Sequence, residues 1–86
     1  MDRKEFMVML DSGHEFTNGT RNKAKLYKQG DRYVLVGNGF CATANSWEFN
    51  KNEENMIHFT KPIKIGDEEI RIPRFLICYD EWTVSE

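Results

Sequence analysis

The sequence predicts an α+β fold in which a short N-terminal helix packs on a curved, mainly antiparallel sheet of five or six strands, barrel-like and small. Three observations support this fold class. A chain of 86 residues has room for one domain, which we expect to span residues 1–86. The clearest signals of a helix lie in the first dozen residues. From His14 onward, turn dipeptides separate short apolar segments, which is typical of strands.

The N-terminal segment carries a start signal, an apolar face and a stop signal for a helix. Asp2 is followed three positions later by an acidic residue, as in a capping box. Phe6, Met9 and Leu10 have the i, i+3, i+4 spacing of one helical face, and Gly13 stands where a left-handed C-terminal cap belongs. We therefore expect a helix, although the unbroken apolar run is also compatible with a buried strand.

The rest of the chain predicts hairpins. Asn18-Gly19 and Gly30-Asp31 are hairpin-turn dipeptides. Isoleucines alternate on both sides of residues 66–69, which predicts a hairpin with one face inward. The expected strands cover residues 25–28, 32–36, 56–60, 63–65, 70–72 and 75–79, with a further extension at 83–84. The segment 75–79 is the most apolar and is expected to be the central strand, whereas 45–55 is compatible with a short helix or a loop.

Composition limits the compartment and the class of protein. No apolar run approaches the ~20 residues of a membrane span, and no leader pattern precedes the domain, so we expect a cytoplasmic protein. Cys41 and Cys78 are far apart among apolar neighbours, which favours buried, reduced thiols over a disulfide between them. The excess of Asn, Lys and Ile over Ala is typical of AT-rich genomes. The chain is similar in character to small accessory proteins of phages and mobile elements, so we expect a bacterial host.

A formal net charge of −2 hides an uneven distribution. Residues 21–32 carry five basic side chains and one acidic side chain. Interleaved tyrosines make this hairpin a candidate for binding single-stranded nucleic acid, although charged residues also protect exposed sheet edges. The candidate nucleic-acid-binding residues are Arg21, Lys23, Lys25, Tyr27, Lys28, Arg32 and Tyr33.

The remainder of the chain is acidic, and its clusters suggest a protein-binding surface. One cluster lies in the turn between the two isoleucine pairs, and another is flanked by aromatic residues near the C-terminus. Acidic side chains around an apolar anchor can complement a basic surface on a partner. The candidate protein-binding residues are Asp67, Glu68, Glu69, Tyr79, Asp80, Glu81 and Trp82.

No residue pattern predicts catalysis or a bound cofactor. The possible soft metal ligands (His14, His58, Cys41 and Cys78) lack the close-spaced pairs of structural zinc sites. The glycines at positions 37 and 39 lack the remainder of a dinucleotide-binding or phosphate-loop motif. We therefore expect no catalytic residues, no metal site and no cofactor.

These observations favour a small non-enzymatic binding protein. We expect an inhibitor or modulator, encoded by a phage or mobile element, that engages a basic surface of a protein partner through acidic and aromatic residues. The alternative is a small nucleic-acid-binding domain that uses the basic hairpin at residues 21–33. We expect no interaction with a membrane, and the oligomeric state stays open.

Overall fold

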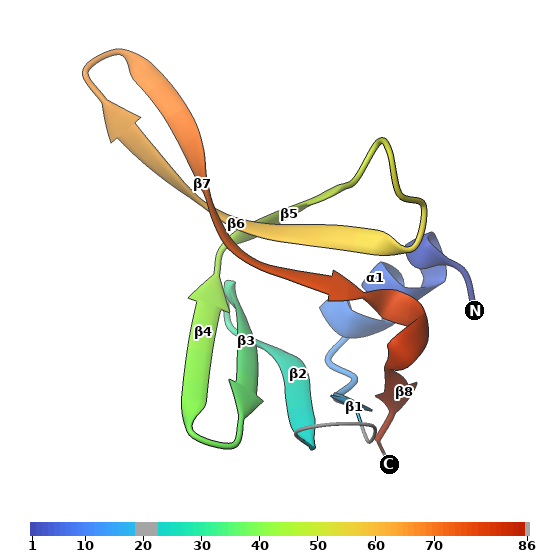
Figure 1. The fold of residues 1–86 in the computed structure, drawn as a ribbon. Helices are drawn as coiled ribbons and strands as arrows, with labels where there is room; N and C mark the ends of the chain where they lie inside the picture. Colours follow the sequence, from blue (N-terminus) through green and yellow to red (C-terminus); the bar gives the residue numbers. More distant parts are fainter. Residues whose placement is uncertain (19–22, 86) are drawn as a thin grey trace.

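The computed structural model describes residues 1–18 and 23–85, which form one helix and two antiparallel sheets (Figure 1). The helix α1 covers Arg3–Asp11. The strands are β1 (Phe16–Asn18), β2 (Ala24–Gln29), β3 (Arg32–Gly37), β4 (Phe40–Ala44), β5 (Ser46–Phe49), β6 (Met56–Ile65), β7 (Glu68–Cys78) and β8 (Thr83–Val84), with a 3₁₀ turn η1 (Tyr79–Glu81) before β8. Sheet A has the order β4-β3-β2-β1-β8, and sheet B has the order β5-β6-β7.

The predicted helix is confirmed, together with both of its caps. The Asp2 carboxylate accepts a hydrogen bond from the backbone N–H three residues later, at 2.8 Å. At the other end Gly13 has a φ of +101° and donates its N–H to the Leu10 carbonyl. His14 donates to the Met9 carbonyl at 3.1 Å, which completes a Schellman motif. Local sequence therefore determines both ends of α1.

Sheet A contains the predicted β2–β3 hairpin. The two-residue turn Gly30-Asp31 joins these strands, and a φ of +63° at Gly30 matches the positive φ that a type II′ turn needs at its first central residue. The predicted turn at Asn18-Gly19 lies partly outside the described residues. The predicted extension at residues 83–84 is confirmed as β8, which pairs with β1 through Phe16 and Val84.

Sheet B differs from the prediction in two respects. The first four residues of the apolar segment 75–79 form the end of β7, and Tyr79 begins η1. Because β7 pairs with β6 alone among the described residues, the prediction of a central strand is wrong. Its apolar run does not require burial on both faces, because Leu76 points away from the core and is 48% exposed. The ambiguous segment 45–55 begins as strand β5, in which Trp47 and Phe49 pack against the core.

The two sheets remain separate hydrogen-bonded units among the described residues, so the barrel-like arrangement is not observed. The broad α+β class is confirmed, but residues 1–18 and 23–85 form eight strands where five or six were expected. The additional strands arise because the chain passes from β4 into β5 across the single residue Asn45, whose N–H donates to the Thr60 carbonyl. A second crossing, through η1, connects sheet B back to β8.

One apolar core lies between the helix and the two sheets. The ring of Phe6 from α1 packs on Phe16 from β1, with centroids 4.2 Å apart. The rings of Phe59 and Phe75 stack within sheet B, with their centroids 4.7 Å apart. The buried members of the core are Phe6, Met7, Leu10, Phe16, Leu26, Tyr33, Ala44, Ile57, Phe59 and Ile77.

The long strands β6 and β7 continue past this core as a two-stranded projection, which we call the arm (residues 61–72). Figure 1 shows the arm extending away from α1 and sheet A. It begins next to a register irregularity at Phe59/Thr60, where one residue of β7, Arg74, falls between successive pairs with β6. A bulge of this kind bends a ribbon and increases its twist. The molecule is correspondingly elongated, with principal extents of 43 × 29 × 23 Å.

Candidate interaction surfaces

The predicted basic hairpin corresponds to β2 and β3, where ion pairs engage part of its positive charge. The Lys25 ammonium lies 3.6 Å from the Glu15 carboxylate, and the Lys28 ammonium lies 3.6 Å from the Asp11 carboxylate. Lys28 also lies over the ring of Tyr33, 5.3 Å from its centroid. Two of the predicted phosphate-binding cations are thus already paired with carboxylates of the same molecule.

The two tyrosines of this hairpin lie on opposite faces of sheet A. Tyr33 faces the core and is only 5% exposed, with its ring packed edge-on against Phe59 at 5.3 Å. Burial, followed by its hydrogen bond to Asp11, raises the pKa of the Tyr33 phenol far above its ordinary value. Tyr27 lies on the outer face, opposite Val34. A stacking platform that uses both rings is therefore not formed.

The remaining predicted cations do not converge with these rings into one groove. Lys23 and Arg32 are exposed at opposite ends of the β2–β3 hairpin. The backbone of Lys23 has a positive φ of +49°. Arg21 lies outside the described residues.

The C-terminal group of predicted residues does come together, around η1. The ring centroids of Tyr79 and Phe6 are 6.1 Å apart, and Trp82 packs against the core. Asp80 and Glu81, in contrast, are exposed. Tyr79, Asp80 and Trp82, together with the N-terminal methionine, border a shallow hollow of about 330 Å³ that Glu81 does not line. Its lining residues are Met1, Tyr79, Asp80, Trp82, Thr83 and Val84. Both aromatic side chains contribute to the core as well as to this surface.

The two cysteines are free and differ in their environments. Cys41 is exposed on the outer face of β4, so its predicted burial is wrong; β4 is an edge strand, and position 41 faces away from the core. Cys78 is half-buried, and its thiol donates to the Asp80 carboxylate at 2.6 Å while accepting from the Asn55 amide at 3.2 Å. Burial and the adjacent acidic residues raise the pKa of Cys78 to about 11, which keeps the thiol protonated at neutral pH.

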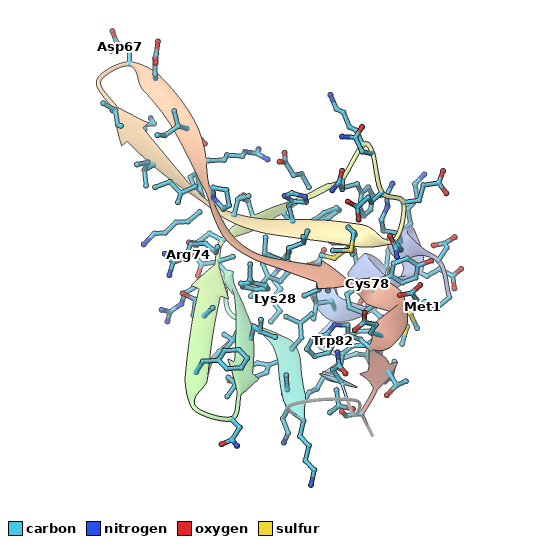
Figure 2. All side chains as sticks on the ribbon, in the orientation of Figure 1. Met1, Lys28, Asp67, Arg74, Cys78 and Trp82 are labelled. Atoms are coloured by element: carbon cyan, nitrogen blue, oxygen red, sulfur yellow. The ribbon has the colours of Figure 1, made fainter. Side chains whose placement is uncertain are left out.

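The acidic cluster at residues 67–69 lies far from the C-terminal group. Figure 2 shows Asp67 at the outer tip of the arm, whereas Cys78 and Trp82 lie near α1 at the opposite end of β7. The acidic cluster lies at the start of the 11-residue strand β7 and the C-terminal group follows its end, and a strand rises ~3.3 Å per residue. The predicted binding residues therefore form two distinct surfaces and not one acidic face.

The arm also carries an apolar face that sequence reasoning placed inside the protein. The predicted hairpin is confirmed, with a positive φ at Gly66, but three of its four isoleucines are exposed and the fourth, Ile63, is only partly buried. Ile65 is 62% exposed, Ile70 is 41% exposed and Ile72 is 39% exposed. The alternation that revealed this face was visible in the sequence, but alternation alone does not show whether a face meets the core or solvent.

A larger hollow near the start of α1 has a volume of about 510 Å³ and a mixed polar lining. Arg3 occupies its border, where the guanidinium lies 4.0 Å from the Phe49 ring centroid and donates to the Asn50 carbonyl at 3.1 Å. Asn50 also contacts the His58 ring at 3.1 Å. Throughout residues 1–18 and 23–85, no three His, Cys, Asp or Glu side chains gather as a metal site would require.

Comparisons with known proteins found no match to a family model, to a curated protein or to a solved structure. Within the described part of the chain, no helix is long and apolar enough to cross a membrane. The assignment of function therefore rests on the surfaces of this chain alone.

Proposed function

We propose that this protein is a non-enzymatic binding protein whose arm is the element that contacts a protein partner. The supporting observation is the uncovered isoleucine face of a ribbon that projects from the core. Exposed apolar side chains that gather on one face mark interaction sites more often than isolated ones do. A two-stranded ribbon without cover is also only marginally stable in water, so burial against a partner stabilises it.

The acidic tip provides the polar part of this contact. Glu68 lies on the isoleucine face at its outer end and Asp67 lies in the adjoining turn, whereas Glu69 lies on the other face, opposite Lys64. The tip thus retains part of the acidic surface expected from the sequence. The arm would insert its apolar face against a partner surface that is apolar at the centre and basic at the rim. Occupying such a surface is how we propose that the protein acts as an inhibitor or modulator.

Site-specific photocross-linking in cells that express the protein tests this function. A photoreactive amino acid at position 65 samples the arm, and the same group at Val8 serves as the matched control. Val8 is an equally exposed apolar residue, at 65%, but lies on α1. We expect protein adducts at position 65 and few at position 8. Equal labelling at the two positions, or no adduct at position 65, would contradict the proposed function.

A further inference from the structure

The apolar face of the arm carries six side chains, and their arrangement allows this face to pack against a copy of itself. Residues directly opposite in an antiparallel pair share a face, and so do residues two apart along a strand. The register of β6 with β7 therefore places Lys61 and Ile72 at the stem of the arm, Ile63 and Ile70 in the middle, and Ile65 and Glu68 at the tip. The face thus has four isoleucines, one cation at its stem and one anion at its tip.

The two charges select one arrangement of two arms. Lys61 and Glu68 are both exposed, and neither forms an ion pair within residues 1–18 and 23–85. If two arms pack face to face and antiparallel, Lys61 of each copy lies at the same end as Glu68 of the other. Parallel packing would instead bring like charges together at both ends, which is unfavourable. A two-fold axis that passes between the two copies, at the height of the Ile63–Ile70 pair, generates the antiparallel arrangement.

The edges of the arm favour packing through this face over strand addition. Hydrogen-bonded and non-hydrogen-bonded pairs alternate along an antiparallel ribbon, and a two-residue turn is closed by a hydrogen-bonded pair, here Ile65 with Glu68. Pro62 and Pro73 then fall at positions whose N–H would point outward. Since proline has no N–H, each free edge of the arm lacks a donor at that position, which is a common protection against edge pairing.

We infer that, in the free protein, the arm binds a second copy of this chain, face to face and antiparallel through the isoleucines, and that two Lys61–Glu68 ion pairs close the dimer. This inference rests on the proposed function, because it names the occupant of the same surface. The arm projects from the body, so antiparallel arms leave the two bodies at opposite ends (Figure 1). Six side chains per copy are far fewer than the ~20–30 residues per side of a stable interface, so the dimer is weak and concentration-dependent.

Sedimentation velocity on the purified protein tests the apolar part of the interface. Between tens of micromolar and about one millimolar, we expect the wild type to shift from monomer to dimer. The Ile65→Ser/Ile70→Ser double variant should stay monomeric, whereas the Val8→Ser control should associate as the wild type does. Circular dichroism establishes that each variant is folded. A wild type that stays monomeric throughout, or a double variant that still dimerises, would overturn the inference.

A charge exchange tests the antiparallel register. Lys61→Glu alone and Glu68→Lys alone each place like charges at both ends of the dimer, and each should weaken self-association by about tenfold. An equimolar mixture of the two variants restores opposite charges at both ends and should recover the wild-type affinity. A mixture that associates no better than its components would exclude this arrangement. If the purified protein is monomeric but position 65 cross-links to a different protein in cells, the proposed function stands and only the dimer is rejected.

Discussion

The phenol of Tyr33 donates a hydrogen bond to the Asp11 carboxylate at 2.5 Å, and this contact joins strand β3 of sheet A to the last residue of α1. The Lys28 ammonium approaches the same carboxylate and also covers the Tyr33 ring. One phenol, one carboxylate and one ammonium therefore attach the helix to the sheet. This polar contact lies directly beside the aromatic core, because the Tyr33 ring also packs edge-on against Phe59.

Removing the Tyr33 hydroxyl should loosen this attachment without leaving a large cavity. We expect Tyr33→Phe to lower the free energy of unfolding by about 1–2 kcal/mol, because a hydrogen bond to a charged group is lost while the ring packing is kept. Tyr27→Phe is the matched control, since Tyr27 lies on the outer face of the same hairpin. Urea denaturation followed by circular dichroism measures both changes. Equal effects of the two substitutions would argue against a structural role for the Asp11 contact.

The raised pKa of Tyr33 predicts loss of stability in alkali. The folded state keeps the phenol protonated above the ordinary tyrosine pKa of about 10, whereas the unfolded state releases that proton. The folded state then binds more protons than the unfolded state, so the free energy of unfolding decreases as the pH rises above about 10. Tyrosinate absorbance should show that Tyr33 ionises only together with unfolding. The Tyr33→Phe variant should lack this late step; its persistence in the variant would contradict the assignment.

The stacked pair at the base of the arm should account for much of the stability of sheet B. Phe59 is fully buried and contacts both Phe75 and Tyr33. We expect Phe59→Ala to cost about 3–5 kcal/mol, because it leaves a cavity at the centre of the core. Leu76→Ala, on the exposed side of the neighbouring strand, should change the free energy of unfolding by less than about 0.5 kcal/mol. Thermal and urea unfolding of both variants distinguish these expectations.

The two thiols should differ in reactivity. With a pKa of about 11, Cys78 is almost entirely protonated at pH 8, and it should react at least ~10-fold more slowly with iodoacetamide than the exposed Cys41. Cys41→Ser and Cys78→Ser leave one thiol each, so the two rates can be measured separately by mass spectrometry. Asp80→Asn removes an acceptor and a negative charge from Cys78 and should accelerate that thiol only. An unchanged rate would show that the Asp80 contact does not govern the reactivity of Cys78.

Features that depend on adjacent residues could be predicted from the sequence. The Asp2 cap, the Gly13 stop and the Gly30-Asp31 turn each need only a few neighbouring side chains, and all are present. The alternation of isoleucines likewise predicted the β6–β7 hairpin. These are local choices of backbone conformation, which short segments determine largely by themselves.

Features that depend on distant packing could not be predicted. Alternation along β2 and β3 separated Tyr27 from Tyr33, but only the position of α1 decides that Tyr33 faces the core. The same limit applies to the arm, whose isoleucines are exposed because the helix and sheet A do not extend beneath them. Strand β5 was not predicted, because the asparagines around it are typical of turns. Trp47 and Phe49 nevertheless have the two-residue spacing of one strand face.

The pairing of β8 with β1 has a consequence for how the molecule folds. Thr83 and Thr17 are opposite each other in sheet A although 66 positions separate them in the chain. A contact of this range closes a long loop, and loop closure must precede any gain from the contact. The hairpins can form within microseconds from neighbouring segments, whereas we expect this long-range pairing to form more slowly. During synthesis, the edge of β1 that pairs with β8 therefore stays open until residues 83–84 have left the ribosome.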